Sequence, residues 1–304
     1  MSPSPLDLFT AFGVGRRPGS ELAEFAQDLG PGLTDHRGLI EMPVLAMLFD
    51  DIGGVPFFFG LGPGSDGNPP RPPAAMPSMQ SRISMSMLDR LSVDDRLDAV
   101  GRVRIDSADY GVTDVEVRSA AGLVCTGTAR NMRVGRDVVE VGDHLQVPEP
   151  VAPSAPAVAA PDPGSSGGEI IAGLAAGDLP RGPFADLLGV RVAVDGDAVV
   201  TEAAAAPWTA NIMGTMHGGV IGALVGQGLS YGAQAHTAPG QDYLISEYSV
   251  SFLRSPAVDG RPVTVRVQPI KLGRRLSVLQ AFLYDGETVL AHAVADVRMD
   301  LSVS

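Results

Sequence analysis

The 304-residue chain has few of the residues that mark secreted, metal-binding or nucleic-acid-binding proteins. It has one cysteine, Cys125, so no disulfide can form within the chain, and no Cys/His cluster suggests zinc. A lone cysteine fits a reducing cytoplasm. Lysine and arginine total 22 against 35 acidic residues, a net charge of −13. Because nucleic acids and anionic membranes recruit basic surfaces, we expect neither as a partner.

Long apolar segments and targeting signals are also lacking. The longest stretch of glycine and apolar residues, around 217–234, is interrupted by Gln227 and Ser230 and falls short of a bilayer-spanning helix. At the N-terminus the arginines follow the apolar residues, the reverse of a secretory signal. Hydrophobic residues make up 45% of the chain, enough for a packed core. These features predict a soluble cytoplasmic protein.

Residues 146–168 divide the chain into halves of similar length. The segment QVPEPVAPSAPAVAAPDPGSSGG contains six prolines and closes on GSSGG, which is typical of a semi-stiff linker with no packed element. We therefore expect one domain at 1–145 and a second at 169–304. Halves of similar length call for a search for an internal repeat.

The two halves align with each other in two segments. LFTAFGV at 8–14 matches FADLLGV at 184–190 with an offset of 176. RISMSMLDRLSVDDR at 82–96 matches EYSVSFLRSPAVDGR at 247–261 with an offset of 165, and six of the last 13 positions are identical. The offset falls by 11, so the first half carries an insertion, for which the loop at 61–78 is the obvious place. Whether that loop is a lid stays open.

Each half has the same order of expected elements. An apolar turn leads to an extended segment, then to a helix rich in small residues, at about 41–54 or 217–234, and then to several strands. In the second half these strands alternate apolar and polar residues and are separated by turn sequences such as AVDGR and YDGE, which indicates antiparallel hairpins. A buried helix with a long antiparallel sheet, twice over, predicts an α+β fold.

The segment NIMGTMHGGVIGALVG at 211–226 carries the most specific pattern. Its N-x-x-G-x-x-H-G-G spacing, followed by an apolar helix of small residues, resembles the hotdog-fold acyl-CoA thioesterases, the PaaI-like branch of the 4-hydroxybenzoyl-CoA thioesterase superfamily. The run from PIKLGRRLS to VADVRM also looks like the last strands of that family. The resemblance covers 184–300 and reaches the first half through the repeat. It implies two tandem hotdog domains, each a long antiparallel sheet wrapped round a central helix, joined as an intrachain pseudo-dimer.

The resemblance implies hydrolysis of an acyl-CoA thioester and roles for residues at the start of the second helix. Backbone N–H groups there have no intrahelical partner, and the helix dipole adds partial positive charge. Gly218 would donate its N–H to the oxyanion, and Gly219 would contribute to substrate binding. Asn211 would orient the attacking water or the substrate. His217 would support the site rather than act as the base.

The acid of that family stands nine residues after the histidine, where this chain has Gly226. Nine helical residues turn the side chain through about 180° and rise about 13 Å, so an acid there serves the partner unit. Subtracting 176 from 226 gives Asp50 in the first half. We therefore predict one composite site made of Asp50, Asn211, His217 and Gly218. Asp51 is the alternative acid, and the sequence leaves open whether the acid is a general base or a nucleophile.

The reciprocal site is predicted to be inactive. In the first half Asp35 stands where the second half has its asparagine, Glu41 stands where it has its histidine, and Met42 and Pro43 stand where it has two glycines. A carboxylate at this position would repel an oxyanion, and Pro43 suits the first turn of a helix.

Three basic residues are candidates for binding the CoA phosphates. Lys271, Arg274 and Arg275 cluster at the start of a strand on an otherwise acidic chain. The corresponding stretch of the first half has Asp106 and Asp109 instead. No metal is expected, and no cofactor beyond the CoA that forms part of the substrate.

Two other functions compete with thioester hydrolysis. A non-catalytic acyl-CoA-binding module is the alternative that the missing acid suggests. A hydratase or dehydratase is disfavoured, because the chain lacks a G-D-x-N-P-x-H segment. Phe57, Phe58 and Phe59 are candidates for an acyl pocket or for the core. The identity of the acyl group, the choice between CoA and an acyl-carrier protein, and a homodimer of such chains stay open.

Overall fold

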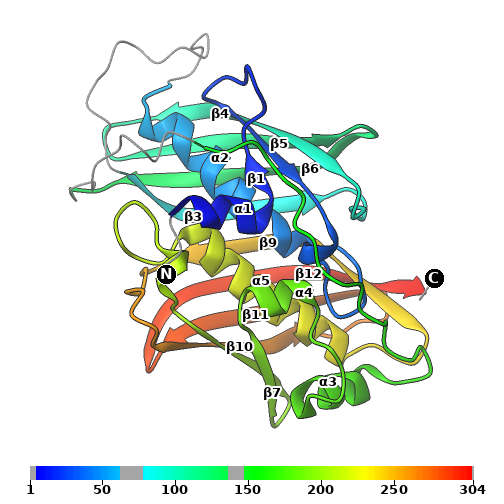
Figure 1. Ribbon diagram of the computed structural model, residues 1–304. Coiled ribbons are helices and arrows are strands. Elements are labelled where there is room, and N and C mark those ends of the chain that lie inside the picture. Colours follow the sequence, from blue (N-terminus) through cyan, green and yellow to red (C-terminus); the bar gives the residue numbers. More distant parts are fainter. Residues whose placement is uncertain (1–4, 62–77, 136–146, 303–304) are drawn as a thin grey trace.

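The computed structural model describes residues 5–61, 78–135 and 147–302. Within these residues the strands form one antiparallel sheet of 12 strands, and helices α2 and α5 lie against it and contact each other (Figure 1). This confirms the α+β class.

The elements of the first half are α1 (Pro5–Phe12), β1 (Val14–Gly15), β2 (Glu24–Asp28), α2 (Ala46–Phe58), β3 (Ser78–Met87), β4 (Arg96–Asp106), β5 (Tyr110–Ser119) and β6 (Gly122–Arg133). Those of the second are α3 (Gly167–Ala176), α4 (Pro183–Leu187), β7 (Arg191–Asp195), β8 (Ala198–Ala204), α5 (Gly218–Ala235), β9 (Gln241–Phe252), β10 (Pro262–Lys271), β11 (Leu276–Asp285) and β12 (Thr288–Ser302).

The strand order is symmetric about the centre of the sheet. From one edge it runs β1-β2-β4-β5-β6-β3, and from the other edge it runs β7-β8-β10-β11-β12-β9. Strands β3 and β9 pair at the centre, where Ser84 lies opposite Ser249 and their hydroxyl oxygens are 3.0 Å apart. These serines are equivalent at the predicted offset, since 249 minus 84 is 165. The repeat seen in the sequence therefore corresponds to the symmetric order of the strands, whose centre lies between these two serines.

The offset of 176 also holds in the structure. Gly38 and Gly214 are equivalent at this offset and both adopt a left-handed conformation, with φ of 77° and 73°. The Asp35 N–H bonds to the carbonyl oxygen of Leu39 at 2.8 Å, and the Asn211 N–H closes an equivalent turn at 2.7 Å. The two halves therefore contain the same loop conformation here, although the identity of their sequences is low.

The two buried helices differ in where they begin. Helix α5 lies within one residue of the predicted range 217–234. Helix α2 begins at Ala46 rather than near 41, because Met42–Leu45 forms a 3₁₀ turn with a proline at its start. No helix among the described residues is both long and apolar enough to cross a membrane.

The segment expected to be a semi-stiff linker is bound to the first half. Residues 147–166 contain no helix or strand. The carbonyl oxygen of Pro148 accepts the Arg16 N–H at 2.9 Å, and that of Pro153 accepts the Gly32 N–H at 2.8 Å. Gly30 permits this approach, because a Cβ on it would lie 2.4 Å from the Pro153 oxygen. Residues 148–153 of the linker are therefore held against the first half rather than forming a free tether, while the carbonyl oxygen of Pro163 accepts the Gly240 N–H of the second half at 2.7 Å.

The expectation that GSSGG forms no packed element is wrong. The Ser166 side chain accepts the Glu169 N–H, and the Glu169 carboxylate accepts the Ser166 N–H, which makes a capping box. This cap starts helix α3 at Gly167, inside the range assigned to the linker. The other domain boundaries stay predictions, and the loop proposed for the insertion lies outside the described residues except at its ends.

The contact between Gly30 and the linker can be tested by adding one methyl group. We expect Gly30→Ala to lower the free energy of unfolding by about 1–3 kcal/mol, because the methyl would overlap a backbone oxygen that cannot move without shifting the linker. Gly168→Ala is the matched control, since its methyl would meet nothing within 4 Å. Urea denaturation of both variants measures the difference, and equal stabilities would contradict the docking of the linker.

Candidate active site

The loop before α5 fixes where that helix begins. The side-chain oxygen of Asn211 accepts hydrogen bonds from the backbone N–H groups of Met213 at 2.9 Å and Thr215 at 3.2 Å. Gly214 turns the chain in a left-handed conformation that favours glycine. His217 is then the N-cap residue, and α5 begins at the next position. The N-x-x-G-x-x-H-G-G pattern is therefore a turn followed by a helix start.

Asp50 of α2 lies at the N-terminus of α5. Its Oδ2 accepts the backbone N–H of Gly219 at 2.7 Å and lies 2.8 Å from Nδ1 of His217. The unpaired N–H groups and the helix dipole stabilise a carboxylate at this position. A Cβ on Gly218 would lie 2.7 Å from Oδ1 of Asp50, so only glycine permits the approach. The structure thus brings Asp50 of the first half to the HGG segment of the second, while their catalytic roles stay predictions.

Small residues let the two helices cross this closely. A Cβ on Gly219 would lie 2.6 Å from Cα of Met47, and one on Gly222 would lie 3.0 Å from Cβ of Ala46. Side chains at either glycine would push the helices apart. The glycines therefore set the distance from Asp50 to the α5 N-terminus.

His217 lies between two carboxylates. The Gly219 N–H lies 2.7 Å from Oδ2 of Asp50 and 3.1 Å from Nδ1 of His217, and Nδ1 lies 2.8 Å from the same Asp50 oxygen. Nε2 faces Oδ1 of Asp51 at 3.6 Å. Burial alone would lower the pKa of His217, but the two carboxylates raise it to about 10. The imidazole is therefore a cation at neutral pH, which suits a supporting group better than a base.

Asp51 is more deeply buried than its neighbour and less well satisfied. Its Oδ2 is buried with no hydrogen-bond partner. Burial raises the pKa of Asp51, although His217 opposes the shift. Asp51 contacts the helix start only through His217, whereas Asp50 contacts it directly. The geometry therefore favours Asp50 as the acid.

These groups lie at one end of a mainly apolar pocket of about 200 Å³. Its wall includes Asp50, Asp51, Asn211, His217 and Gly218. The apolar part includes Leu8, Phe9, Phe25, Phe58, Phe59 and Phe252. Of the three phenylalanines singled out in the sequence, Phe57 instead packs in the core against β5.

Two hydrogen-bond donors in the pocket are free of acceptors among the described residues. The backbone N–H of Gly218 has no acceptor among these residues, and it is the neighbouring N–H of Gly219 that binds Asp50. The side-chain nitrogen of Asn211 has none either, while its oxygen is engaged in the turn. Both donors remain available to a ligand.

Lys271, Arg274 and Arg275 lie away from this pocket. None of them lines it, and all three are exposed. The Met216 N–H bonds to Pro256 just before β10, so that strand starts near the α5 N-terminus and ends, at Lys271, far from it. The three residues follow the end of β10 that lies away from the pocket, so their position does not support phosphate binding at this site.

The reciprocal end of the helix pair is filled. Pro43 packs against Gly226, where a Cβ would lie 2.4 Å from the proline Cβ. Glu41 is buried, and its Oε2 accepts the backbone N–H of Ile245 at 3.1 Å. A proline ring and a carboxylate thus occupy the places that hold glycines and a histidine at the other end.

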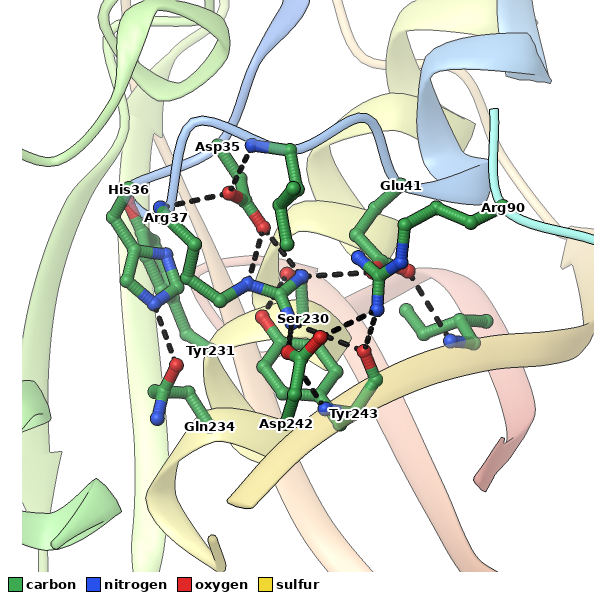
Figure 2. Close-up of polar contacts among 12 residues, drawn as sticks. Asp35, His36, Arg37, Glu41, Arg90, Ser230, Tyr231, Gln234, Asp242 and Tyr243 are labelled. Carbon is green, nitrogen blue, oxygen red and sulfur yellow. Dashed lines mark hydrogen bonds and ion pairs between the residues drawn. The ribbon is translucent and has the colours of Figure 1, made fainter. Parts of the chain in front are cut away.

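A buried ion cluster has formed around Glu41, as Figure 2 shows. Arg37 binds Asp35 at 2.5 Å, Glu41 at 2.7 Å and Asp242 at 2.5 Å. Arg90 binds Glu41 at 3.1 Å and Asp242 at 2.8 Å. Burial raises the pKa of Glu41 despite the two arginines. Asp242 belongs to β9 and the other four residues to the first half, so the cluster joins the halves.

Three polar residues of the pocket carry no signal in the sequence. The Gln80 side chain donates to the backbone oxygen of Asp50, and the Asn131 side chain donates to that of Gly53 at 2.9 Å. Both brace α2 from strands β3 and β6. Arg16, just after β1, also lines the pocket. Strand pairing assembles these residues from distant positions, so no local pattern marks them.

The pH dependence of stability tests the charge of His217. A histidine whose pKa is raised on folding contributes stability that is fully present below its unfolded pKa, about 6.5, and is lost as pH rises through the folded value, here about 10. We expect the difference in unfolding free energy between wild type and His217→Gln to be largest below pH 6.5 and to shrink steadily towards pH 10. A constant difference over this range would contradict the imidazolium.

The ion cluster makes a second prediction about stability. We expect Asp242→Asn to lower the free energy of unfolding by about 3–5 kcal/mol, because it removes one of the two carboxylates that the partly buried Arg37 and Arg90 share. Asp195→Asn, in an exposed pair with Arg266, is the matched control and should change little. Denaturant titrations compare them, and equal effects would mean that the cluster does not hold the halves together.

Comparison with known proteins agrees with this geometry. The family model of the thioesterase superfamily matches residues 213–292, which span helix α5 and most of the second-half sheet. A search of curated proteins finds no significant match.

Solved structures extend the likeness to the whole chain. A protein named as a thioesterase from Novosphingobium aromaticivorans is 13% identical, with a TM-score of 0.58 and coverage of 95% of this chain and 99% of that one. The tesB protein of Mycobacterium avium subs paratuberculosis is 9% identical, with a TM-score of 0.57 and coverage of 98% and 100%. At these identities the structures show the fold alone. The match to the thioesterase superfamily is therefore confined to 213–292, while the fold of the whole chain is that of these solved structures.

Proposed function

We propose that the chain is a tandem pair of hotdog units that hydrolyses acyl-CoA thioesters at one composite site. The observation that carries this proposal is the contact of Asp50, from the first half, with the α5 N-terminus of the second half inside a pocket. The symmetric strand order supports the tandem arrangement. The filled reciprocal end supports a single site per chain.

The pocket offers the groups that thioester hydrolysis requires. A thioester carbonyl directed at the α5 N-terminus would receive the free N–H of Gly218, which stabilises the negative charge that develops on the oxygen. Asp50 would then lie beside the carbonyl carbon. The apolar wall would hold the acyl chain. CoA leaves as the thiol once the bond from carbon to sulfur breaks, and no cofactor is needed.

Asp50 can act on the thioester by two routes. As a general base it takes a proton from a water that attacks the carbonyl carbon. As a nucleophile it attacks the carbon itself and forms an anhydride, which water then hydrolyses. A single turnover in H₂¹⁸O separates the routes, because only the second can place ¹⁸O in the Asp50 carboxylate.

The catalytic role of Asp50 is tested by thiol release from a panel of acyl-CoAs. We expect Asp50→Asn to lower kcat by about 10²–10⁴, because the amide neither accepts a proton nor attacks carbon. Cys125 will not disturb the assay, since it is fully buried and burial raises its pKa to about 12.

Asp51→Asn is the matched control, because it changes the adjacent carboxylate that does not touch Gly219. We expect a smaller loss for this variant. A larger loss for Asp51→Asn would make Asp51 the acid. Tight binding of acyl-CoA without turnover by the wild type would instead favour the non-catalytic binding module.

A further inference from the structure

Arg16 differs from the other basic residues of the described chain. Every other described arginine or lysine without a carboxylate oxygen within 4.0 Å is exposed, whereas Arg16 is partly buried. The next residue, Arg17, binds Asp28 at 2.9 Å and Asp98 at 2.7 Å. Burial lowers the pKa of Arg16, which shows the cost of holding this charge without a partner.

The described residues hold the guanidinium of Arg16 in place, and none of them forms an ion pair with it. One terminal nitrogen donates to the carbonyl oxygen of Leu22 at 2.8 Å. The guanidinium carbon lies 4.5 Å from the ring centroid of Phe25. Nε is buried with no hydrogen-bond partner. The group is therefore oriented in advance, with donor capacity that no described residue uses.

This unused cation lies in the pocket that contains Asp50. Both residues line it, together with Phe25. The equivalent position in the second half, 176 residues further on, is the buried apolar Val192. Asp51 raises the pKa of Arg16 but makes no ion pair with it and instead faces His217. The cation thus lies in the pocket without an anionic partner among the described residues.

We propose that Arg16 binds a carboxylate on the acyl group, so that the substrates are CoA monothioesters of short dicarboxylic acids. The proposal rests on the thioesterase function proposed above. The planar guanidinium presents a fork of donors that matches a carboxylate. The apolar wall around it accommodates the methylene groups between the carboxylate and the thioester.

A phosphate of CoA is the other anion that the substrate could offer to Arg16. The two sources differ in what a substitution does. Loss of a phosphate contact weakens the binding of every acyl-CoA alike, whereas loss of a contact with an acyl carboxylate weakens the binding of dicarboxylic substrates only. Thioesters of N-acetylcysteamine lack phosphates, so they retain the acyl contact alone.

The experiment compares matched pairs of substrates of equal chain length. Succinyl-, glutaryl- and adipoyl-CoA are assayed against butyryl-, pentanoyl- and hexanoyl-CoA, with the spontaneous hydrolysis of each subtracted. We expect wild type to favour the dicarboxylic member in kcat/KM. Arg16→Met, which keeps the stem over Phe25, should lower that preference by at least about tenfold. Arg17→Met is the matched control and should keep the wild-type preference.

Each outcome decides between distinct possibilities. The same loss of preference with N-acetylcysteamine thioesters supports the acyl carboxylate. An equal effect of Arg16→Met on both members of each pair overturns the proposal and assigns Arg16 to the phosphates of CoA or to the acid pair. If wild type hydrolyses none of these six thioesters but does hydrolyse another acyl-CoA, only the dicarboxylate proposal is overturned. If it hydrolyses no acyl-CoA at all, the proposed thioesterase function itself fails.

A measurement on the wild type covers the case in which Arg16→Met does not fold. The free acids are products of the reaction, so they compete for the acyl pocket. We expect glutarate to inhibit at least about tenfold more strongly than pentanoate, because only glutarate offers a carboxylate to Arg16 beyond the one at the reaction centre. Equal inhibition by the two acids overturns the proposal.

Discussion

The close crossing of α2 and α5 is the contact on which the rest of the structure depends. Gly219 and Gly222 of α5 carry no side chain that would clash with Met47 and Ala46 of α2. The crossing places a carboxylate of one half at the helix N-terminus of the other, where unpaired N–H groups and the helix dipole stabilise it. Residues of both halves therefore line one pocket as a direct result of how closely their helices pack.

The two ends of this crossing have diverged in opposite directions. At one end glycines leave room for Asp50 and a pocket. At the other end Pro43 fills the space over Gly226, and Glu41 is bound within a set of ion pairs (Figure 2). Buried charges are tolerated only when they are paired. In the proposed function, the carboxylate of Glu41 would repel a developing oxyanion, so the residue that joins the halves through ion pairs would also leave this end without a second site.

The part of the site that the sequence predicted follows from helical geometry. The resemblance implied an acid nine residues after the histidine, and the repeat offset with 100° per helical residue moved that position from Gly226 to Asp50. The structure places Asp50 beside the HGG segment, and its catalytic role stays a proposal. Lys271, Arg274 and Arg275 do not line the pocket, because the sequence did not show which end of the strand faces it. Their role in binding phosphate stays a prediction. The capping box of Ser166 and Glu169 was readable from its spacing but lay inside a stretch dominated by prolines.

The sequence by itself determined the repeat, the helix start at His217 and the complementary loss of groups in the two halves, because each depends on local spacing. The pairing of β3 with β9, the docking of residues 147–166 and the positions of Arg16, Gln80 and Asn131 were decided by the tertiary structure alone. These features depend on contacts between residues far apart in the chain. Their free energy comes from packing and from satisfying buried polar groups, which no local pattern encodes.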